Sequence, residues 1–167
     1  MKVKNKTVKK IVTCGNKGIE MGFVDFSIKH DIKITGMTYK NNSSFVNFLK
    51  LKETNYIKDA VYNNVENSDF SIIITPLCNY CFNTINICRE LEKPYIVIDP
   101  SISDIYKIKT KILKLKKQKI TINISSSNYP YNTGFDWFKK TYRYSKYPLN
   151  PYTRGSRLAR NLFELDE

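Results

Sequence analysis

The chain has 167 residues, of which 41% are hydrophobic and 26% charged, which excludes a disordered or collagen-like protein and suffices for one buried core. No run approaches the roughly 18 apolar residues of a membrane helix, and the N-terminus lacks an apolar signal, so we expect a soluble intracellular protein without a membrane partner. The formal net charge of +13 favours a polyanionic partner.

Strand and helix patterns alternate along the chain. Strands are predicted where β-branched residues run together, and helices where apolar residues recur every three or four positions. The predicted strands are 10–14, 32–35, 69–75, 94–99 and 120–124, and the predicted helices are 18–30, 55–66, 80–92, 104–117 and 134–144. The nearly continuous apolar strand at 69–75 is typical of parallel strands that are buried on both faces.

This alternation predicts an α/β fold, a three-layer Rossmann-like sandwich with a mainly parallel sheet of five or more strands. We expect the Rossmann-like domain over residues 10–145, between a basic N-terminal arm at 1–9 and a basic C-terminal extension at 146–167. Ligands of such folds bind beyond the carboxyl ends of the strands. The loops that follow these strands therefore form the candidate site.

The loop after the first predicted strand contains two glycines and leads into a helix. Glycine lets backbone N–H groups approach a phosphate, and a lysine and the helix dipole add favourable charge. The candidate phosphate- or nucleotide-binding residues are Gly15, Asn16, Lys17, Gly18, Glu20, Lys40 and Thr84. Any tight turn from a strand to a helix also favours glycine, so a purely structural turn is the alternative.

Several motifs match those of a known family. Positions 14–21 read Cys-Gly-Asn-Lys-Gly-Ile-Glu-Met against its Gly-Gly-Gln-Thr-Gly-Val-Asp-Arg, and positions 60–69 keep its Asn-Val and Ser-Asp. Further matches are Gly36, Lys40, Lys93, Pro94 and Asp99. Residues 10–145 thus resemble the "putative molybdenum carrier" family, a Rossmann-like branch related to the cytokinin-activating lysine decarboxylase-like proteins.

The resemblance implies a Rossmann-like fold, and it is weakest where a ligand would bind. Met21 replaces the arginine of the family's first loop, and Ala60 and Tyr62 replace an Arg and a Glu. Asn79 and Tyr80 stand where the family has two glycines. The pattern indicates a scaffold that kept its fold and lost or changed its ligand.

The basic residues gather in three segments. Residues 1–10 contain five Lys and residues 107–119 contain seven, in both cases without an acidic residue. Residues 139–167 contain seven Lys or Arg against three acidic residues, and the rest of the chain carries a net charge of −3. The composition also indicates an AT-rich source genome, so codon bias is the alternative explanation, although bias alone predicts an even distribution of Lys.

These segments supply the predicted nucleic-acid contacts. In the last one, Arg residues stand among Tyr residues; Arg makes bidentate contacts with phosphate, and Tyr stacks on bases. The candidate contact residues are Lys2, Lys4, Lys6, Lys107, Lys111, Lys114, Lys117, Arg143, Arg154, Arg157 and Arg160. We expect a nucleic-acid partner, RNA rather than DNA, and protein neighbours in an assembly.

The four Cys and the single His do not combine into a metal site or a catalytic dyad. Cys78, Cys81 and Cys88 are three thiols, whereas a tetrahedral zinc site needs four ligands, and Cys88 falls on the apolar face of its helix. Packing in the core is the favoured role. A redox pair of the thioredoxin type is the alternative, because Cys78 and Cys81 straddle a predicted helix start. We expect no catalytic residue, no metal and no cofactor.

Two functions from different classes follow. The first is a non-catalytic, basic Rossmann-like protein that acts as a structural or binding component of a nucleic-acid-containing assembly. The second is a binding protein or hydrolase for a nucleotide or another phosphorylated small molecule at the Gly15–Gly18 loop. The clustered charge and the altered ligand loops favour the first.

Overall fold

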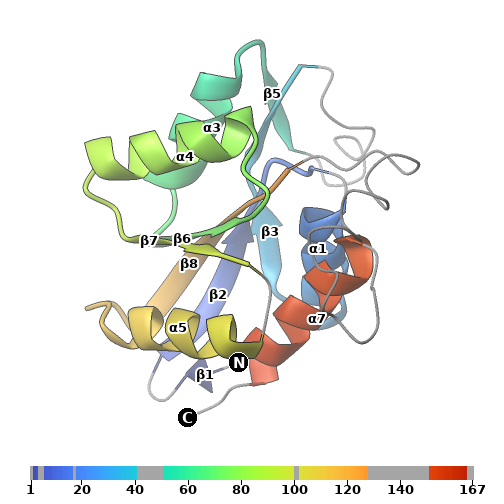
Figure 1. The fold of residues 1–167 in the computed structure, drawn as a ribbon, viewed down its shortest axis with the longest axis vertical. Helices are drawn as coiled ribbons and strands as arrows, with labels where there is room; N and C mark the ends of the chain where they lie inside the picture. Colours follow the sequence, from blue (N-terminus) through green and yellow to red (C-terminus); the bar gives the residue numbers. More distant parts are fainter. Residues whose placement is uncertain are drawn as a thin grey trace.

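The centre of the molecule is one mainly parallel sheet. The computed structural model describes residues 2–3, 6–16, 18–40, 51–99, 102–127 and 151–164. The sheet contains β1 (Lys2–Val3), β2 (Lys6–Val12), β3 (Lys33–Thr35), β6 (Phe70–Ile74), β7 (Tyr95–Ile98) and β8 (Lys119–Ser125). Strands β3, β2, β8, β6 and β7 are parallel in that order, and β1 pairs antiparallel with β2 (Figure 1).

The last strand in the chain lies in the middle of the sheet. On one side β8 pairs with β2, with Ile122 opposite Ile11, and on the other side it pairs with β6, with Ile124 opposite Ile72. All five residues of β6 are buried, as the sequence pattern indicates. The carboxyl ends of β2, β8 and β6 therefore meet near the middle of one edge of the sheet.

Three helices cover one face of the sheet: α1 (Ile19–Lys29), α5 (Ile102–Leu113) and α7 (Pro151–Glu164). Ile19, Phe23 and Phe26 recur at helical spacing in α1 and pack in the core. The same core contains Ile108 and Ile112 of α5, Leu158, Ala159 and Leu162 of α7, and the apolar residues of β6 and β8 that face them.

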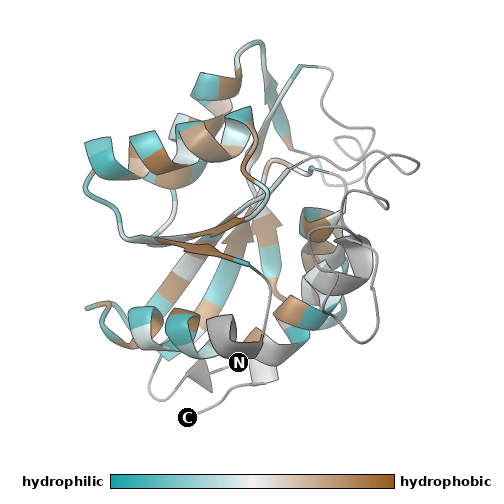
Figure 2. Cartoon of the chain, viewed as in Figure 1, coloured by the Kyte–Doolittle hydropathy of each residue, from teal (hydrophilic) through white to brown (hydrophobic). Residues whose placement is uncertain are grey.

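The opposite face is covered by α3 (Ile57–Glu66) and α4 (Asn79–Glu90), beside a parallel pair of short strands, β4 (Met37–Tyr39) and β5 (Lys52–Thr54). Their second apolar cluster includes Ala60, Val61, Val65, Ile87 and Cys88. Two helical layers thus enclose the apolar strands (Figure 2). The predicted three-layer Rossmann-like sandwich is confirmed.

The structure differs from the expected boundaries at both ends of the chain. β2 begins at Lys6, so it takes up part of the segment 1–9, and Val8 is buried in the core. A register shift between Val8 and Lys10 interrupts the alternation that would have indicated a longer strand. Residues 151–164, expected in an extension, form α7, which packs on α1. The shift to Pro, Tyr and Arg in this segment obscures the helical spacing of its apolar residues.

Between these ends, the predicted elements that fall on described residues are found within a few residues of their expected bounds. No strand is predicted at β4 or β5, which are three residues long and mostly polar. The predicted helix at 134–144 lies outside the described residues. Among the helices of the described segments, none combines the length and the apolar character needed to cross a membrane.

Candidate functional site

Buried polar side chains gather where β2 and β8 end. They are Thr13, Asn16, Glu20, Thr84, Ser125 and Ser126, all without exposed surface, and we call them the polar cluster. The first three surround the turn from β2 to α1, Thr84 lies in α4, Ser125 is the last residue of β8, and Ser126 follows it. Ligands of parallel α/β folds bind at this edge of the sheet, so the polar cluster is the candidate site.

Glu20 is the centre of the polar cluster. Its Oε1 accepts hydrogen bonds from Thr13 Oγ1 at 2.5 Å and from the backbone N–H of Cys14 at 3.3 Å. Its Oε2 accepts hydrogen bonds from the backbone N–H and the Oγ of Ser126, at 3.1 and 2.9 Å. The carboxyl group therefore ties the end of β2 to the end of β8.

Burial raises the pKa of Glu20 to about 7, because removal from water disfavours the charged form of a carboxyl group. The hydrogen bonds from Thr13 and Ser126 act in the opposite direction. The group thus changes its protonation near neutral pH. In its charged form it repels any anion that approaches the β2–α1 turn.

The other members of the polar cluster also bond within the protein. Asn16 Nδ2 donates to the backbone oxygen of Ser126 at 2.7 Å. The hydroxyl oxygens of Thr84 and Ser125 lie 2.9 Å apart, and Thr84 Oγ1 is also 2.9 Å from the Tyr80 backbone oxygen. Since a hydroxyl has one proton, Thr84 donates to Tyr80 and accepts from Ser125. These bonds join the β2–α1 turn to Ser126 and join α4 to the end of β8.

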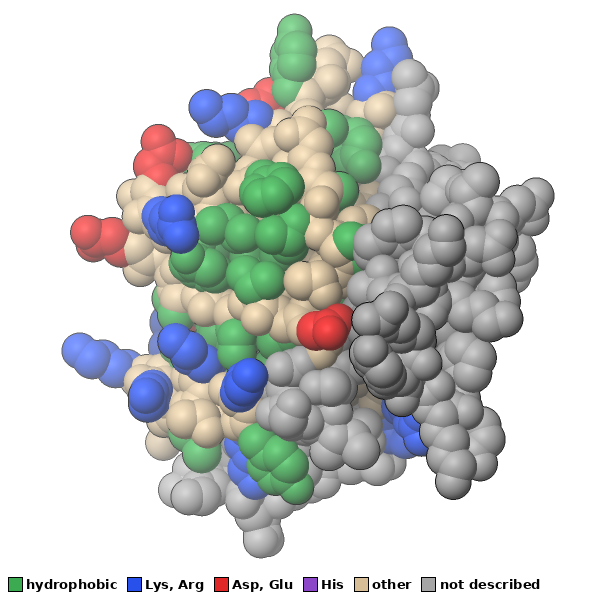
Figure 3. Space-filling model, viewed as in Figure 1, with side chains coloured by type: hydrophobic (Ala, Val, Ile, Leu, Met, Phe, Trp, Pro, Cys, Tyr) green, Lys and Arg blue, Asp and Glu red, His purple; other side chains and the backbone are tan. Residues whose placement is uncertain are grey.

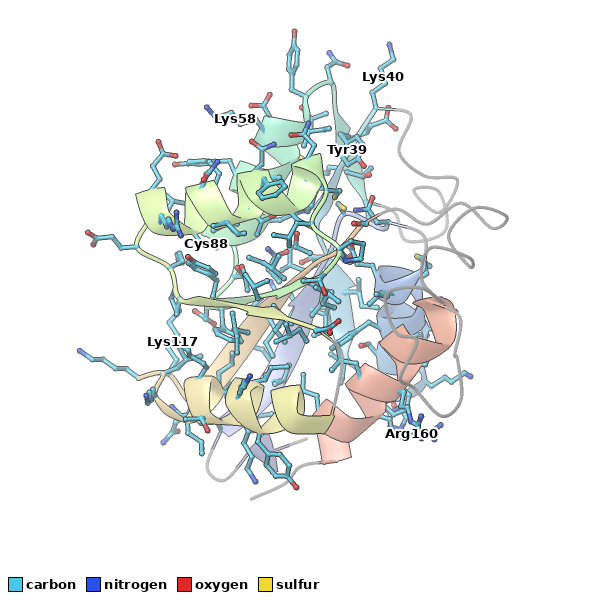
Figure 4. All side chains as sticks on the ribbon, viewed as in Figure 1. Tyr39, Lys40, Lys58, Cys88, Lys117 and Arg160 are labelled. Carbon is cyan, nitrogen blue, oxygen red and sulfur yellow. The ribbon has the colours of Figure 1, made fainter. Side chains whose placement is uncertain are left out.

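The β2–α1 turn has the backbone conformation that only glycine adopts easily. Gly15 and Gly18 have φ values of 76° and 93°, in the left-handed region. Gly18 immediately precedes α1, and no side chain caps this helix start. Of the other residues predicted for this site, Lys17 lies outside the described residues, and Lys40 is exposed and points outward (Figure 4).

Three residues beside the polar cluster were not predicted from the sequence. Tyr39 donates its hydroxyl proton to Asn16 Oδ1 at 3.3 Å. Asn64 Nδ2 donates to the Tyr80 hydroxyl at 2.7 Å, and burial raises the pKa of Tyr80. Tyr39 and Tyr80 belong to no motif that indicates a site, whereas Asn64 stands in the Asn-Val pair of the family resemblance.

The cysteines lie at two places in the described structure, in the second apolar cluster and at the start of α4. Within the described segments, no group of three or more His, Cys, Asp or Glu is suited to a metal ion. Cys88 packs in the second apolar cluster, as the sequence analysis expects. Cys78 and Cys81 lie at the start of α4 with their sulfur atoms 3.5 Å apart.

Exposed lysines cover α5 and the turn that follows it (Figure 3). We name the basic face as Lys107, Lys111, Lys114, Lys116, Lys117 and Lys119, all exposed. Lys6 joins it, since its Nζ donates to the backbone oxygen of Leu115 and, at 2.8 Å, to that of Lys117. The first and second basic segments of the sequence therefore meet in space.

The third basic segment lies on the same side of the sheet, because its helix α7 contacts α5. Helix α5 also contacts β1 of the first basic segment. Arg157 and Arg160 of α7 are exposed, and the Arg160 guanidinium lies 5.8 Å from the centre of the Phe26 ring. Of the remaining predicted contact residues, Lys2 belongs to β1, Arg154 belongs to α7, and Lys4 and Arg143 lie outside the described residues.

Comparison with known proteins identifies the fold. No sequence family and no curated protein matches the chain. A solved structure that is similar to it is the crystal structure of a "putative molybdenum carrier protein" from Syntrophus aciditrophicus. The likeness has 21% sequence identity and a TM-score of 0.69, and it covers 95% of this chain and 96% of the other. It confirms the molybdenum-carrier-like Rossmann-like fold implied by the sequence motifs.

Proposed function

We propose that this chain is a non-catalytic Rossmann-like protein that binds nucleic acid, with RNA as the expected partner, as a component of a larger assembly. The meeting of three basic segments around α5 is the observation that carries this proposal. Phosphate contacts need cations that are exposed and close together, and the lysines of the basic face have both properties.

The charge is distributed unequally between two stretches of the described chain. Residues 51–99, which contain α3 and α4, have four basic and seven acidic side chains. Residues 102–127, which contain α5 and β8, have seven basic and one acidic. Tyr106 is 61% exposed beside Lys107 and offers a ring on which a base can stack. This asymmetry favours a polyanion that docks from one side.

The polar cluster supports the non-catalytic part of the proposal. A catalytic or phosphate-binding site needs donors directed at the ligand, whereas the described donors of the polar cluster are directed at protein oxygens. The carboxyl group of Glu20 occupies the position between β2 and β8, and it opposes an anion there.

The test is nucleic-acid binding by two variants of equal net charge. The first carries Lys107→Glu, Lys111→Glu and Lys114→Glu on α5. The matched control carries Lys40→Glu, Lys52→Glu and Lys58→Glu, three exposed lysines. Lys40 and Lys58 lie on the α3–α4 side (Figure 4), and Lys52 begins β5, beside α3 and α4. Affinity for labelled single-stranded RNA and DNA is measured by fluorescence anisotropy at several salt concentrations.

We expect the α5 variant to lose about tenfold or more in affinity, and its log–log salt slope to fall by about 2 for three lost phosphate contacts on a single strand. The control variant shares the loss of net charge but keeps the basic face, so its salt slope stays near that of the wild type. Equal losses in the two variants would contradict a localised binding surface, and so would the absence of binding by the wild type at low salt.

A second candidate function is the binding of a phosphorylated small molecule or an oxyanion at the β2–α1 turn. The left-handed glycines Gly15 and Gly18 before an uncapped helix start favour it, and the similar solved structure bears the name of a molybdenum carrier. Calorimetric titration with phosphate, molybdate and ATP tests it. Saturable binding that persists in the α5 variant and is lost in a folded Gly15→Val variant would support this candidate, and no heat with any of the three would contradict it.

A further inference from the structure

The pair of cysteines at the start of α4 has no part in the proposed function. Cys78 directly precedes the first helical residue, and Cys81 lies in the first turn, so their sulfur atoms approach to 3.5 Å. Cys78 is half-buried, whereas Cys81 has no exposed surface. When two sulfur atoms are close and only one is accessible to solvent, the accessible thiol reacts first and the buried thiol then completes a disulfide.

The two thiols also differ in acidity. The hydrogen bond between them lowers the pKa of Cys78 to about 6, and the backbone N–H groups of Cys81 and Tyr80 act in the same direction. The same hydrogen bond raises the pKa of Cys81, and burial raises it further. The positive end of the α4 dipole also favours a thiolate at Cys78. Near neutral pH, Cys78 is therefore the nucleophile and Cys81 keeps its proton.

The other cysteines lack these properties. Cys14 and Cys88 are fully buried, and burial raises the pKa of both thiols. The Sγ of Cys14 lies 3.6 Å from Glu20 Oε1, so a thiolate there would face a carboxylate. The reactive arrangement is thus specific to one pair among the four cysteines.

We propose that Cys78 and Cys81 form a reversible dithiol–disulfide pair, with Cys78 as the attacking thiol and Cys81 as the resolving thiol. The oxidant is a low-molecular-weight disulfide such as oxidised glutathione. This activity is separate from nucleic-acid binding, since the pair lies at the carboxyl edge of the sheet and the basic face lies along α5.

The reaction proceeds in two exchange steps. The Cys78 thiolate attacks one sulfur of the oxidant, whose S–S bond breaks, and the other sulfur leaves as a thiolate. Cys81 then loses its proton and attacks Cys78 Sγ, which forms the bond between the two cysteines and releases the second thiol of the oxidant. Two protein thiols are oxidised by two electrons, and one small disulfide is reduced to two thiols.

The experiment equilibrates the full chain in buffers of graded reduced and oxidised glutathione. Free thiols are alkylated, and peptide mass spectrometry then identifies the disulfides. The Cys81→Ser variant should accumulate a mixed disulfide between Cys78 and glutathione, because the resolving thiol is absent. Cys78→Ser should accumulate neither species. The control, Cys88→Ser, removes a buried thiol of the same helix and should form the disulfide as the wild type does.

The rate of mixed-disulfide formation tests the role of Cys78 separately. At pH 6 the thiolate fraction of Cys78 exceeds that of an ordinary thiol of pKa about 8.5, while its intrinsic nucleophilicity is lower. The net expectation is a reaction with oxidised glutathione about tenfold faster than that of an ordinary thiol at this pH. Circular dichroism confirms that each variant is folded.

Two results would overturn the proposal. One is a folded wild-type chain that forms no Cys78–Cys81 disulfide in excess oxidised glutathione. The other is oxidation of Cys14 or Cys88 to the same extent as the pair. Neither depends on nucleic-acid binding, so the two proposals fail independently.

Discussion

The polar cluster and the basic face are both rich in polar side chains, but their surroundings are opposite. In the polar cluster, Glu20 has no exposed surface, and its two oxygens accept four hydrogen bonds from N–H and O–H groups of the protein. On the basic face, the side chain of Lys117 is 71% exposed. The buried groups are hydrogen-bonded within the fold, whereas the lysines of the basic face are exposed to solvent.

This difference separates stability from binding. Removing a buried acceptor leaves donors without partners and costs stability, while removing an exposed charge changes little in the folded state. Variants in the polar cluster should therefore change the free energy of unfolding, and variants on the basic face should change the affinity for nucleic acid.

The largest effect is expected from Glu20→Ala. The substitution leaves the hydroxyls of Thr13 and Ser126 and two backbone N–H groups without their acceptor in a buried site. We expect a loss of about 3–5 kcal/mol in the free energy of unfolding, measured by urea denaturation at pH 6. Lys111→Ala, an exposed change on the basic face, should stay within about 0.5 kcal/mol. Similar losses of unfolding free energy in Glu20→Ala and Lys111→Ala would contradict the difference between the polar cluster and the basic face.

The pH dependence of stability sharpens the contrast. The folded pKa of Glu20, about 7, lies above its ordinary value of 4.5, so the folded state binds this proton more tightly than the unfolded chain does. The stability that this shift contributes is fully present below pH 4.5 and is lost as the pH rises through 7. A shift of this size corresponds to about 3 kcal/mol.

Urea denaturation of the wild type and of Glu20→Gln at pH 4 and pH 8 checks this expectation. Gln keeps the size and one acceptor oxygen but does not titrate, so the change with pH should be about 3 kcal/mol smaller in the variant. Cys78, whose folded pKa of about 6 lies below that of an ordinary thiol, adds stability as the pH rises. That contribution is common to both proteins and cancels in their difference. Parallel pH profiles would show that Glu20 does not titrate as inferred.

The sequence predicts what is local in this site and misses what the sheet brings together. Gly15, Gly18 and Glu20 lie within six consecutive positions, so their turn and helix start are visible in the sequence. Ser126 is 106 residues from Glu20, and only the parallel pairing of β2 with β8 brings the two together. The pairing of β2 with β8 buries the carboxyl group of Glu20 against Ser126. The sequence alone does not show this burial, so it predicts Glu20 as a ligand-binding residue.

The packing of the C-terminal helix α7 could not be predicted from the sequence either, because it depends on a glycine, a residue without a side chain. Gly155 of α7 lies so close to α1 that a Cβ at this position would overlap the backbone oxygen of Ile19. Glycine in a helix normally costs stability, so the sequence pattern argues against a helix at the position where close packing requires glycine.

Gly155→Ala tests whether α7 and its arginines belong to the body of the protein. The added methyl group must push α7 away from α1, and we expect a loss of about 1–3 kcal/mol by thermal or urea denaturation. Ser156→Ala, which removes a 2.9 Å hydrogen bond to the backbone oxygen of Gly22, should cost about 1 kcal/mol. A Gly155→Ala variant as stable as the wild type would place α7 outside the core.

The smallest effect concerns the ion pair at the border of the basic face. Lys117 Nζ lies 2.9 Å from Asp69 Oδ1, with side-chain exposures of 71% and 15%, and Asp69 Oδ2 accepts a hydrogen bond from the backbone N–H of Thr121. In a double-mutant cycle with Lys117→Ala and Asp69→Ala, the coupling energy should stay below about 1 kcal/mol, because solvent screens an exposed lysine. A coupling energy of about 2 kcal/mol or more would make Lys117 a structural residue like Glu20. Exposure alone would then not be sufficient to assign the lysines of the basic face to nucleic-acid binding.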